Sequence, residues 1–273
     1  MNDDEHKDTA YAEPDEPTAG PYLLALFDVL GFSERVKRDG ILKVLGTYRD
    51  LIETAVLEPA RRCLGTVNTP EGRITTLFVL PVRYAYFSDT ILLWVPLQQV
   101  FAAAFVTRCA DLMCHALRKG VPLRGAISLG EAVMHKATNT YIGEPLIEAA
   151  KLEKGQNWIG LTLANSATWP PFVAELEGPS IIEYMAPMKN GCEQFASPIV
   201  IDWPRIWRDS QTDSAADYLR QINNDEKFAC YYENAAEFIR YSEESHDWYK
   251  NPEKIRKDAK LRLVPYSEIT KAK

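Results

Sequence analysis

Residues 22–33 read YLLALFDVLGFS, and this stretch decides the fold. Positions 22–30 are apolar except for Asp28, which is the pattern of a strand covered on both faces. Gly31 then breaks the run, and the following residues lead into a helical pattern. A carboxylate at the end of so apolar a strand is expected to have a partner, because an unpaired buried charge is costly.

A second acidic residue interrupts another apolar stretch, AYFSDTILLW at residues 85–94, where we expect a hairpin near Ser88 and Asp89. Each aspartate alone also fits a capping or turn role. If folding brings the two strands together, the carboxylates would repel each other by about 4 kcal/mol at 4 Å and an effective dielectric of 20. Either one is then protonated, or a hard cation such as Mg²⁺ or Mn²⁺ lies between them. Backbone N–H groups of the turn at Gly31 suit phosphate oxygens, so the pattern is consistent with a nucleoside-triphosphate site.

The rest of the chain alternates between strand and helix patterns, which predicts an α+β fold with helices packed on a sheet. Residues 64–73 have turn chemistry and are expected to form a loop. Helices are expected at 41–56, 97–117, 143–153 and 214–241, and strands at 74–80, 82–94, 121–133, 158–163, 181–184 and 198–201.

The sequence predicts a polar tail at residues 1–20, a domain at 21–170 and, after the change in composition beyond Pro170 and Pro171, a C-terminal extension at 171–273 that packs on the core or on a dimer mate. The net charge of −7 argues against nucleic acid as a partner. The five scattered cysteines favour reduced thiols and a cytoplasmic location. We find no signal-peptide pattern and no run approaching the roughly 20 apolar residues of a membrane span, so no membrane partner is expected.

Four sequence blocks follow one another along the chain: FDVLGFS at residues 27–33, FSDT at 87–90, LRGAISLGE at 123–131, and GEP at 143–145 continued by EAAKLE at 148–153. In this order they resemble the catalytic domain of class III nucleotide cyclases, which implies that the domain at 21–170 is catalytic. DxLGF, FSD and RGxIxxGE look most similar to the Pycsar pyrimidine cyclases of bacterial anti-phage defence. The resemblance covers residues 21–165, just over half of the chain.

This resemblance implies a ferredoxin-like βαββαβ core with extra C-terminal strands and helices, acting as a homodimer with active sites at the interface. It implies conversion of UTP, or less readily CTP, to the 3′,5′-cyclic monophosphate and pyrophosphate. The cyclic product would be a second messenger for a separate effector in antiviral defence. Two Mn²⁺ or Mg²⁺ ions would be the cofactors.

Carried over by position, Asp28 and Asp89 match the metal-binding aspartates, and Val29 offers its backbone carbonyl. The triphosphate-cradling turn is matched by Gly31, Phe32 and Ser33. The transition-state Asn and Arg of purine cyclases are matched here by Ile147 and Lys151. Lys151 retains a point charge, whereas Ile147 offers nothing polar.

The purine-selecting position four residues before Asp89 is Ala85, which argues against purine recognition in the usual way. Strand alternation puts Arg83 on the face of Ala85, within reach of a pyrimidine or a phosphate. Tyr86 is a base-stacking candidate, with core packing as the commoner role for such a tyrosine. Arg124 is a phosphate-binding candidate, with a structural ion pair as the alternative.

Two other functions remain open on these residues. Ile147 and Lys151 are compatible with a catalytically silent nucleotide-binding regulatory domain, and a purine cyclase with an altered base pocket is the third hypothesis. The sequence contains neither GxxxxGK[ST] nor GxGxxG, and no histidine lies in the context of a hydrolase triad, so P-loop, Rossmann and triad functions are not supported.

Overall fold

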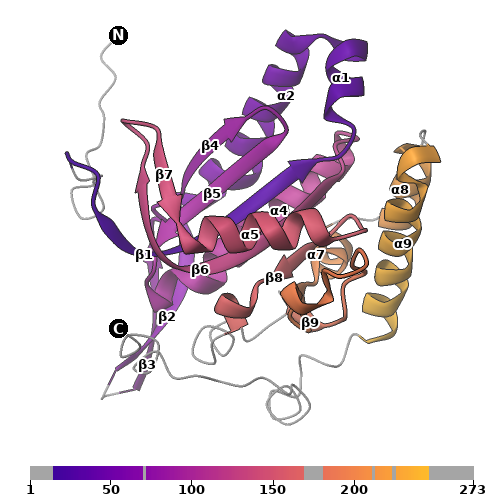
Figure 1. Cartoon of the computed structure of the whole chain (residues 1–273). Helices are drawn as coiled ribbons and strands as arrows, with labels where there is room; N and C mark the ends of the chain where they lie inside the picture. Colours follow the sequence, from indigo (N-terminus) through magenta and orange to yellow (C-terminus); the bar gives the residue numbers. More distant parts are fainter. Residues whose placement is uncertain (1–14, 70–71, 169–180, 211–212, 223–225, 246–273) are drawn as a thin grey trace.

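The structure is a computed structural model that describes residues 15–69, 72–168, 181–210, 213–222 and 226–245 (Figure 1). Most of the predicted tail lies outside these ranges. The first strand begins at Ala19, within the stretch that the sequence predicted as tail. The boundary predicted at residue 170 also lies outside them, and it stays a prediction.

The central part of the sheet has the strand order β4-β5-β1-β6, with β1 antiparallel to both β5 and β6. Helices connect β1 to β4 and β5 to β6, so the predicted ferredoxin-like βαββαβ core is confirmed. Its elements are β1 (Ala19–Val29), α1 (Phe32–Asp39), α2 (Ile41–Ile52), β4 (Arg83–Phe87), β5 (Thr90–Pro96), α4 (Gln99–Arg118) and β6 (Leu123–His135). A π-helical turn (Glu53–Leu57) and α3 (Glu58–Ala60) continue α2.

The sheet extends beyond this core through β8, which is parallel to β6, and then through β10 and β9. The predicted extra C-terminal strands and helices are therefore present. The elements are β7 (Thr140–Gly143), α5 (Glu144–Gly155), β8 (Leu161–Leu163), β9 (Ile181–Glu183), β10 (Ile199–Ile201), α7 (Trp203–Ser210), α8 (Ala215–Ile222) and α9 (Ala229–Glu244), with short 3₁₀ turns at Asn165–Thr168, Glu193–Phe195 and Glu226–Phe228.

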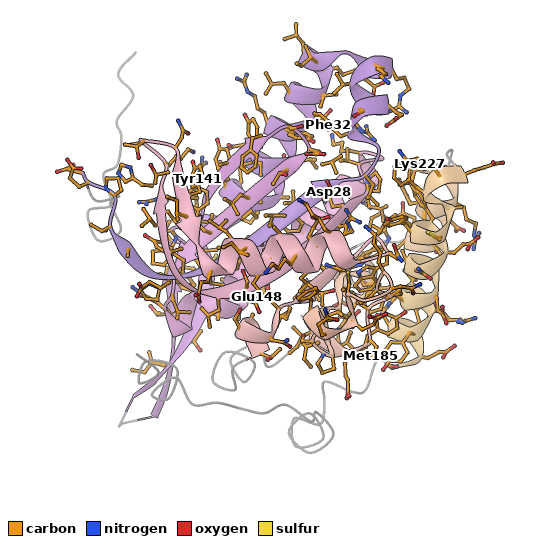
Figure 2. All side chains as sticks on the ribbon, viewed as in Figure 1. Asp28, Phe32, Tyr141, Glu148, Met185 and Lys227 are labelled. Atoms are coloured by element: carbon orange, nitrogen blue, oxygen red, sulfur yellow. The ribbon has the colours of Figure 1, made fainter. Side chains whose placement is uncertain are left out.

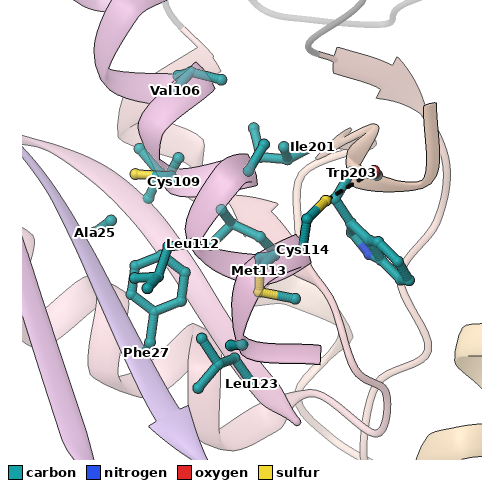
Figure 3. Packing of buried hydrophobic residues seen from close by; sticks show 14 of the residues in the cluster. Ala25, Phe27, Val106, Cys109, Leu112, Met113, Cys114, Leu123, Ile201 and Trp203 are labelled. Carbon is teal, nitrogen blue, oxygen red and sulfur yellow. Dashed lines mark hydrogen bonds between the residues drawn. The ribbon is translucent and has the colours of Figure 1, made fainter. Parts of the chain in front are cut away.

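The apolar run of β1 is explained by the two layers that cover it. Leu23, Ala25 and Phe27 belong to the large core beneath α2 and α4, while Leu24 and Leu26 face the smaller cluster beneath α5. Figure 3 shows Phe27 of β1 and Leu112 of α4 among the residues of the large core, and a dashed line joins the Cys114 thiol to the Trp203 carbonyl, 3.5 Å apart. The alternation leaves Asp28 on the α5 face of the sheet.

The expectation of a loop at residues 64–73 was wrong. Within the described part of this stretch, β2 (Cys63–Thr69) and β3 (Gly72–Phe78) pair as an antiparallel ribbon, in which Asn68 and Gly72, two of the residues typical of turns, are themselves paired. One segment does meet the length and composition of a membrane span, Val100–Arg118 with a mean hydropathy of 1.4. It is most of α4, and 61% of it is buried inside the fold.

Candidate nucleotide and metal site

The site is built where β1 ends and where β5 and β6 begin. Asp28 is opposite Thr90 on one side and opposite Arg124 on the other. The Val29 N–H donates to the Asp89 carbonyl at 2.9 Å. Residues 61 positions apart in sequence are therefore neighbours at one end of the sheet (Figure 2 marks Asp28 and Phe32 there).

Asp89 belongs to the hairpin predicted from the sequence. Phe87 pairs with Thr90, which leaves a two-residue loop of Ser88 and Asp89. Ser88 has φ 55°, a left-handed conformation that is uncommon for a non-glycine residue. The tight loop fixes the position of the Asp89 backbone against β1.

The surroundings of Asp28 shift its pKa in opposite directions. Burial is the main cause that raises its pKa above the ordinary value; the neighbouring Arg124 acts in the opposite direction, and the charge of Asp89 adds to the rise. Lys189 also lowers this pKa, so its ammonium lies within electrostatic range of the carboxylate. A further cation beside Asp28 would favour the charged form of its carboxylate.

Arg124 bridges two carboxylates with one nitrogen. Its Nη2 lies 3.1 Å from Asp28 Oδ2 and 2.5 Å from Glu153 Oε1. Its Nη1 donates to the Gln156 carbonyl at 3.0 Å and lies 3.5 Å from the Tyr231 hydroxyl. The structural ion pair weighed for Arg124 is thus present, and its phosphate-binding role stays a prediction.

Glu153 is the more deeply buried of the two carboxylates on Arg124. Burial raises its pKa to about 7, against the opposing effect of Arg124. Asp28 contributes to the rise because two carboxylates share one guanidinium. The charge of this cluster therefore changes near neutral pH.

The turn after Asp28 opens a helix. Gly31 has φ 71° and ψ 24°, a left-handed conformation suited to glycine, and α1 begins at Phe32. The first backbone N–H groups of a helix have no partner within it and carry partial positive charge. Ser33 is exposed in this first turn. The turn at 31–33 is thus suited to an anion, as its sequence suggested.

Tyr48 of α2 is a neighbour of the site that the sequence did not reveal. Its side chain is buried, and its hydroxyl has no hydrogen-bond partner among the residues that the structure describes. Burial raises the Tyr48 pKa, and the negative charges of Asp89 and Asp28 raise it further. Its ring contacts Phe32 and Tyr86, with centroids 6.1 and 6.0 Å away.

The other predicted residues lie in different places. Ala85 borders the cluster beneath α5, and the alternation of β4 puts Arg83 on that same face. Tyr86 is on the opposite face, stacked with Tyr84 at 6.0 Å. Lys151 is exposed on α5. A role for each of these residues in substrate binding or catalysis stays a prediction.

Sequence reasoning also left Glu153 and Tyr231 unassigned. Glu153 stands in the EAAKLE block, two positions after Lys151, and a glutamate on the buried side of an amphipathic helix was the available signal. No sequence pattern linked Tyr231 to the site, because it belongs to a helix more than a hundred positions after Arg124.

The donor set fits a hard divalent cation. Asp28 and Asp89 are adjacent, repel each other, and offer only oxygen, which Mg²⁺ and Mn²⁺ prefer. Within the described residues, no group of three or more His, Cys, Asp or Glu side chains forms a metal-binding cluster. Further oxygens would have to come from backbone carbonyls such as that of Val29, from water and from the substrate.

No protein-family model matches the sequence, and no curated protein matches it. Among solved structures, the chain is similar to the adenylyl cyclase CyaB from P. aeruginosa, at 12% identity and a TM-score of 0.41, over 68% of this chain and 94% of that one. It is also similar to the guanylate cyclase domain of RhGC from Catenaria anguillulae in complex with GTP, at 9% identity and a TM-score of 0.40, over 67% and 97% of the two chains.

A third similar structure is that of adenylate cyclases from Trypanosoma brucei in their monomeric state, at 14% identity and a TM-score of 0.41, over 71% of this chain and 92% of that one. Identities and TM-scores this low describe a general likeness. The functional assignment therefore depends on the chain's own residues.

Proposed function

We propose that this chain is a metal-dependent nucleotide cyclase that prefers pyrimidines, UTP ahead of CTP, and forms the 3′,5′-cyclic monophosphate and pyrophosphate. The observation that carries the proposal is the meeting of Asp28 and Asp89 beside the left-handed turn at Gly31. Two carboxylates for metal next to free backbone N–H groups for phosphate are what a metal–triphosphate substrate requires.

The aspartates would hold two Mn²⁺ or Mg²⁺ ions together with the Val29 carbonyl. When bound, these ions would acidify the ribose 3′-hydroxyl and neutralise charge on the phosphates. The backbone N–H groups at 31–33 would orient the terminal phosphates. Correct alignment of the 3′-oxygen with the α-phosphorus is then the main contribution of the chain.

The preference for pyrimidines is supported by Ala85. Its methyl group cannot exchange hydrogen bonds with a purine edge, and it lies on the face of the sheet that also carries Asp28. Arg83 on the same face is the proposed contact to a pyrimidine O2 or a phosphate. Tyr86 lies on the opposite face of β4 from Ala85, against Tyr84 and Tyr48, so a contact with the base would require a bulge or a twist in β4.

We also propose a homodimer with sites at the interface. Lys151 and Glu153 are two positions apart on α5 and so point about 200° apart around the helix axis. Glu153 faces the chain's own Arg124, so the exposed Lys151 faces away from it. Lys151 would therefore complete the site of a second copy rather than its own.

The cyclic product would act in the cytoplasm as a second messenger for a separate effector in anti-phage defence, as the resemblance of the sequence blocks implies.

A specific observation favours an alternative, a catalytically silent nucleotide-binding domain. Ile147 is 56% exposed where purine cyclases carry a transition-state amide, and it offers no polar group. A purine cyclase with a changed base pocket is the remaining alternative.

One assay distinguishes these functions. The purified chain is incubated with Mn²⁺ and each of the four nucleoside triphosphates, and the products are separated by chromatography, with Asp89→Ala as the matched inactive control. We expect cyclic UMP and pyrophosphate in equal amounts. Turnover of ATP or GTP alone would contradict the pyrimidine assignment, and binding without turnover of any nucleotide would favour the regulatory domain.

A further inference from the structure

The C-terminal helix α9 touches the arginine that holds Asp28. The Tyr231 hydroxyl lies 3.5 Å from Arg124 Nη1, and the Arg124 guanidinium carbon is 5.6 Å from the centroid of the Tyr231 ring. This distance is within the range of a cation–π contact. Phe228 immediately precedes the helix, and its ring edge would lie 3.7 Å from a Cβ placed on Gly31. One turn of chain, 228–231, therefore lies beside the proposed phosphate turn and contacts Arg124, the partner of Asp28.

A second bond fixes α9 over the same region. Asn234, one helical turn after Tyr231, donates to the Asn157 carbonyl at 2.7 Å. The preceding residue, Gln156, supplies the carbonyl that accepts from Arg124. The Gln156 side chain is itself held by the Gly125 carbonyl at 2.9 Å and by the Thr162 hydroxyl at 2.8 Å. Arg124 Nη1 therefore lies between the Gln156 carbonyl and helix α9. Helix α9 stands beside the sheet in Figure 1, and Lys227, just before its N-terminal end, is labelled in Figure 2.

We propose that Tyr231 is a positioning residue for the metal-binding carboxylate of Asp28, acting through Arg124, so that the C-terminal helix is part of the catalytic unit. The inference rests on the proposed function, since it takes Asp28 as a metal ligand. The guanidinium is planar, and two of its nitrogens serve three groups: Nη2 serves both carboxylates, and Nη1 serves the Gln156 carbonyl. The ring and hydroxyl of Tyr231 limit rotation of this plane.

Orientation of the guanidinium matters because it competes with a metal ion for the same carboxylate. A guanidinium free to turn toward Asp28 would occupy more of its oxygens and repel an approaching divalent cation. Held by Tyr231, it contacts only Oδ2 and leaves Oδ1 for the ion. Loss of groups that orient a metal ligand typically lowers metal affinity by about 10–100-fold.

The test uses the full chain and Mn²⁺ alone, with free Mn²⁺ measured by electron paramagnetic resonance. Tyr231→Leu removes ring and hydroxyl, and Tyr231→Phe removes the hydroxyl only. The matched control is Tyr241→Phe, which removes a hydroxyl that donates to the Glu183 carbonyl at 2.8 Å from a later turn of the same helix. We expect about tenfold weaker Mn²⁺ binding for Tyr231→Leu, a smaller loss for Tyr231→Phe, and unchanged binding for Tyr241→Phe.

Unchanged Mn²⁺ affinity in Tyr231→Leu, with the unmodified chain binding the ion, would overturn the inference and leave the proposed function intact. If Tyr231→Leu fails to fold, equal Mn²⁺ affinity in Tyr231→Phe and Tyr241→Phe would overturn it. A chain that shows the expected losses of Mn²⁺ affinity but converts no nucleotide would contradict the proposed cyclase activity while supporting the role of Tyr231. Absence of Mn²⁺ binding in the unmodified chain would overturn both.

Discussion

Replacing Glu153 with glutamine should make the chain less sensitive to pH. Glu153 is buried against Arg124, and burial raises its pKa from 4.5 to about 7. Glutamine has nearly the same shape as the protonated carboxyl but cannot ionise. The substitution therefore imitates the low-pH state of this side chain at every pH.

The direction in which stability changes with pH follows from proton binding by Glu153. Between pH 4.5 and about 7, the folded chain keeps a proton on Glu153 that the unfolded chain has lost. The contribution of Glu153 to stability is then greatest below pH 4.5 and is lost as the pH rises through about 7. A pKa rise from 4.5 to about 7 corresponds to roughly 3 kcal/mol. For a chain of this size, that is about 5–10 °C in melting temperature.

The assay is thermal unfolding of both proteins at pH 5, 6, 7 and 8, followed by circular dichroism. We expect the melting temperature of Glu153→Gln, relative to that of the unmodified chain, to rise by about 5–10 °C between pH 5 and pH 8. Glu144→Gln, which removes an exposed carboxylate from the same helix, measures the background. A difference in melting temperature that stays constant over this range would contradict this prediction, because it would mean that the Arg124 ion pair outweighs burial.

Three further substitutions test the site. Asp89→Ala should lower cyclase turnover by about 10²–10³-fold with an unchanged or higher melting temperature, since it removes a repulsive charge; a normal turnover number would contradict this. Gly31→Ala should lower the free energy of unfolding in urea by about 1 kcal/mol, because φ at this position is 71°. We expect no larger loss, since the nearest side-chain atom leaves room for a methyl group. Tyr48→Phe should stabilise the chain by about 1 kcal/mol, since the hydroxyl it removes is buried without a described partner; destabilisation would reveal a missed bond.

The core was accessible from the sequence because its signals are local. The apolar run at residues 22–30, the hairpin at Ser88 and the long helix before Gly120 each carry their own pattern, and all three are present. Residues 64–73 were misjudged because residues typical of turns also occur within paired strands. Likewise α4 passes for a membrane span because a core helix covered by a sheet and by α7 is apolar on most sides.

The carboxylates could be predicted, but their surroundings could not. Asp28 and Asp89 each interrupt an apolar strand, which is visible in the sequence. Arg124, Glu153 and Tyr231 come together only through the pairing of β6 with β1 and the docking of α9. Long-range contacts of this kind leave no periodic signal along the chain.

The central claim is that Asp28 and Asp89 together hold a divalent cation against a triphosphate. Its most direct test is a crystal grown with Mn²⁺ and a non-cyclisable UTP analogue, examined by anomalous scattering at the manganese edge. We expect manganese between the two carboxylates, with the phosphates over the turn at Gly31. Ordered nucleotide with manganese bound elsewhere, and Asp28 still paired with Arg124 alone, would contradict it.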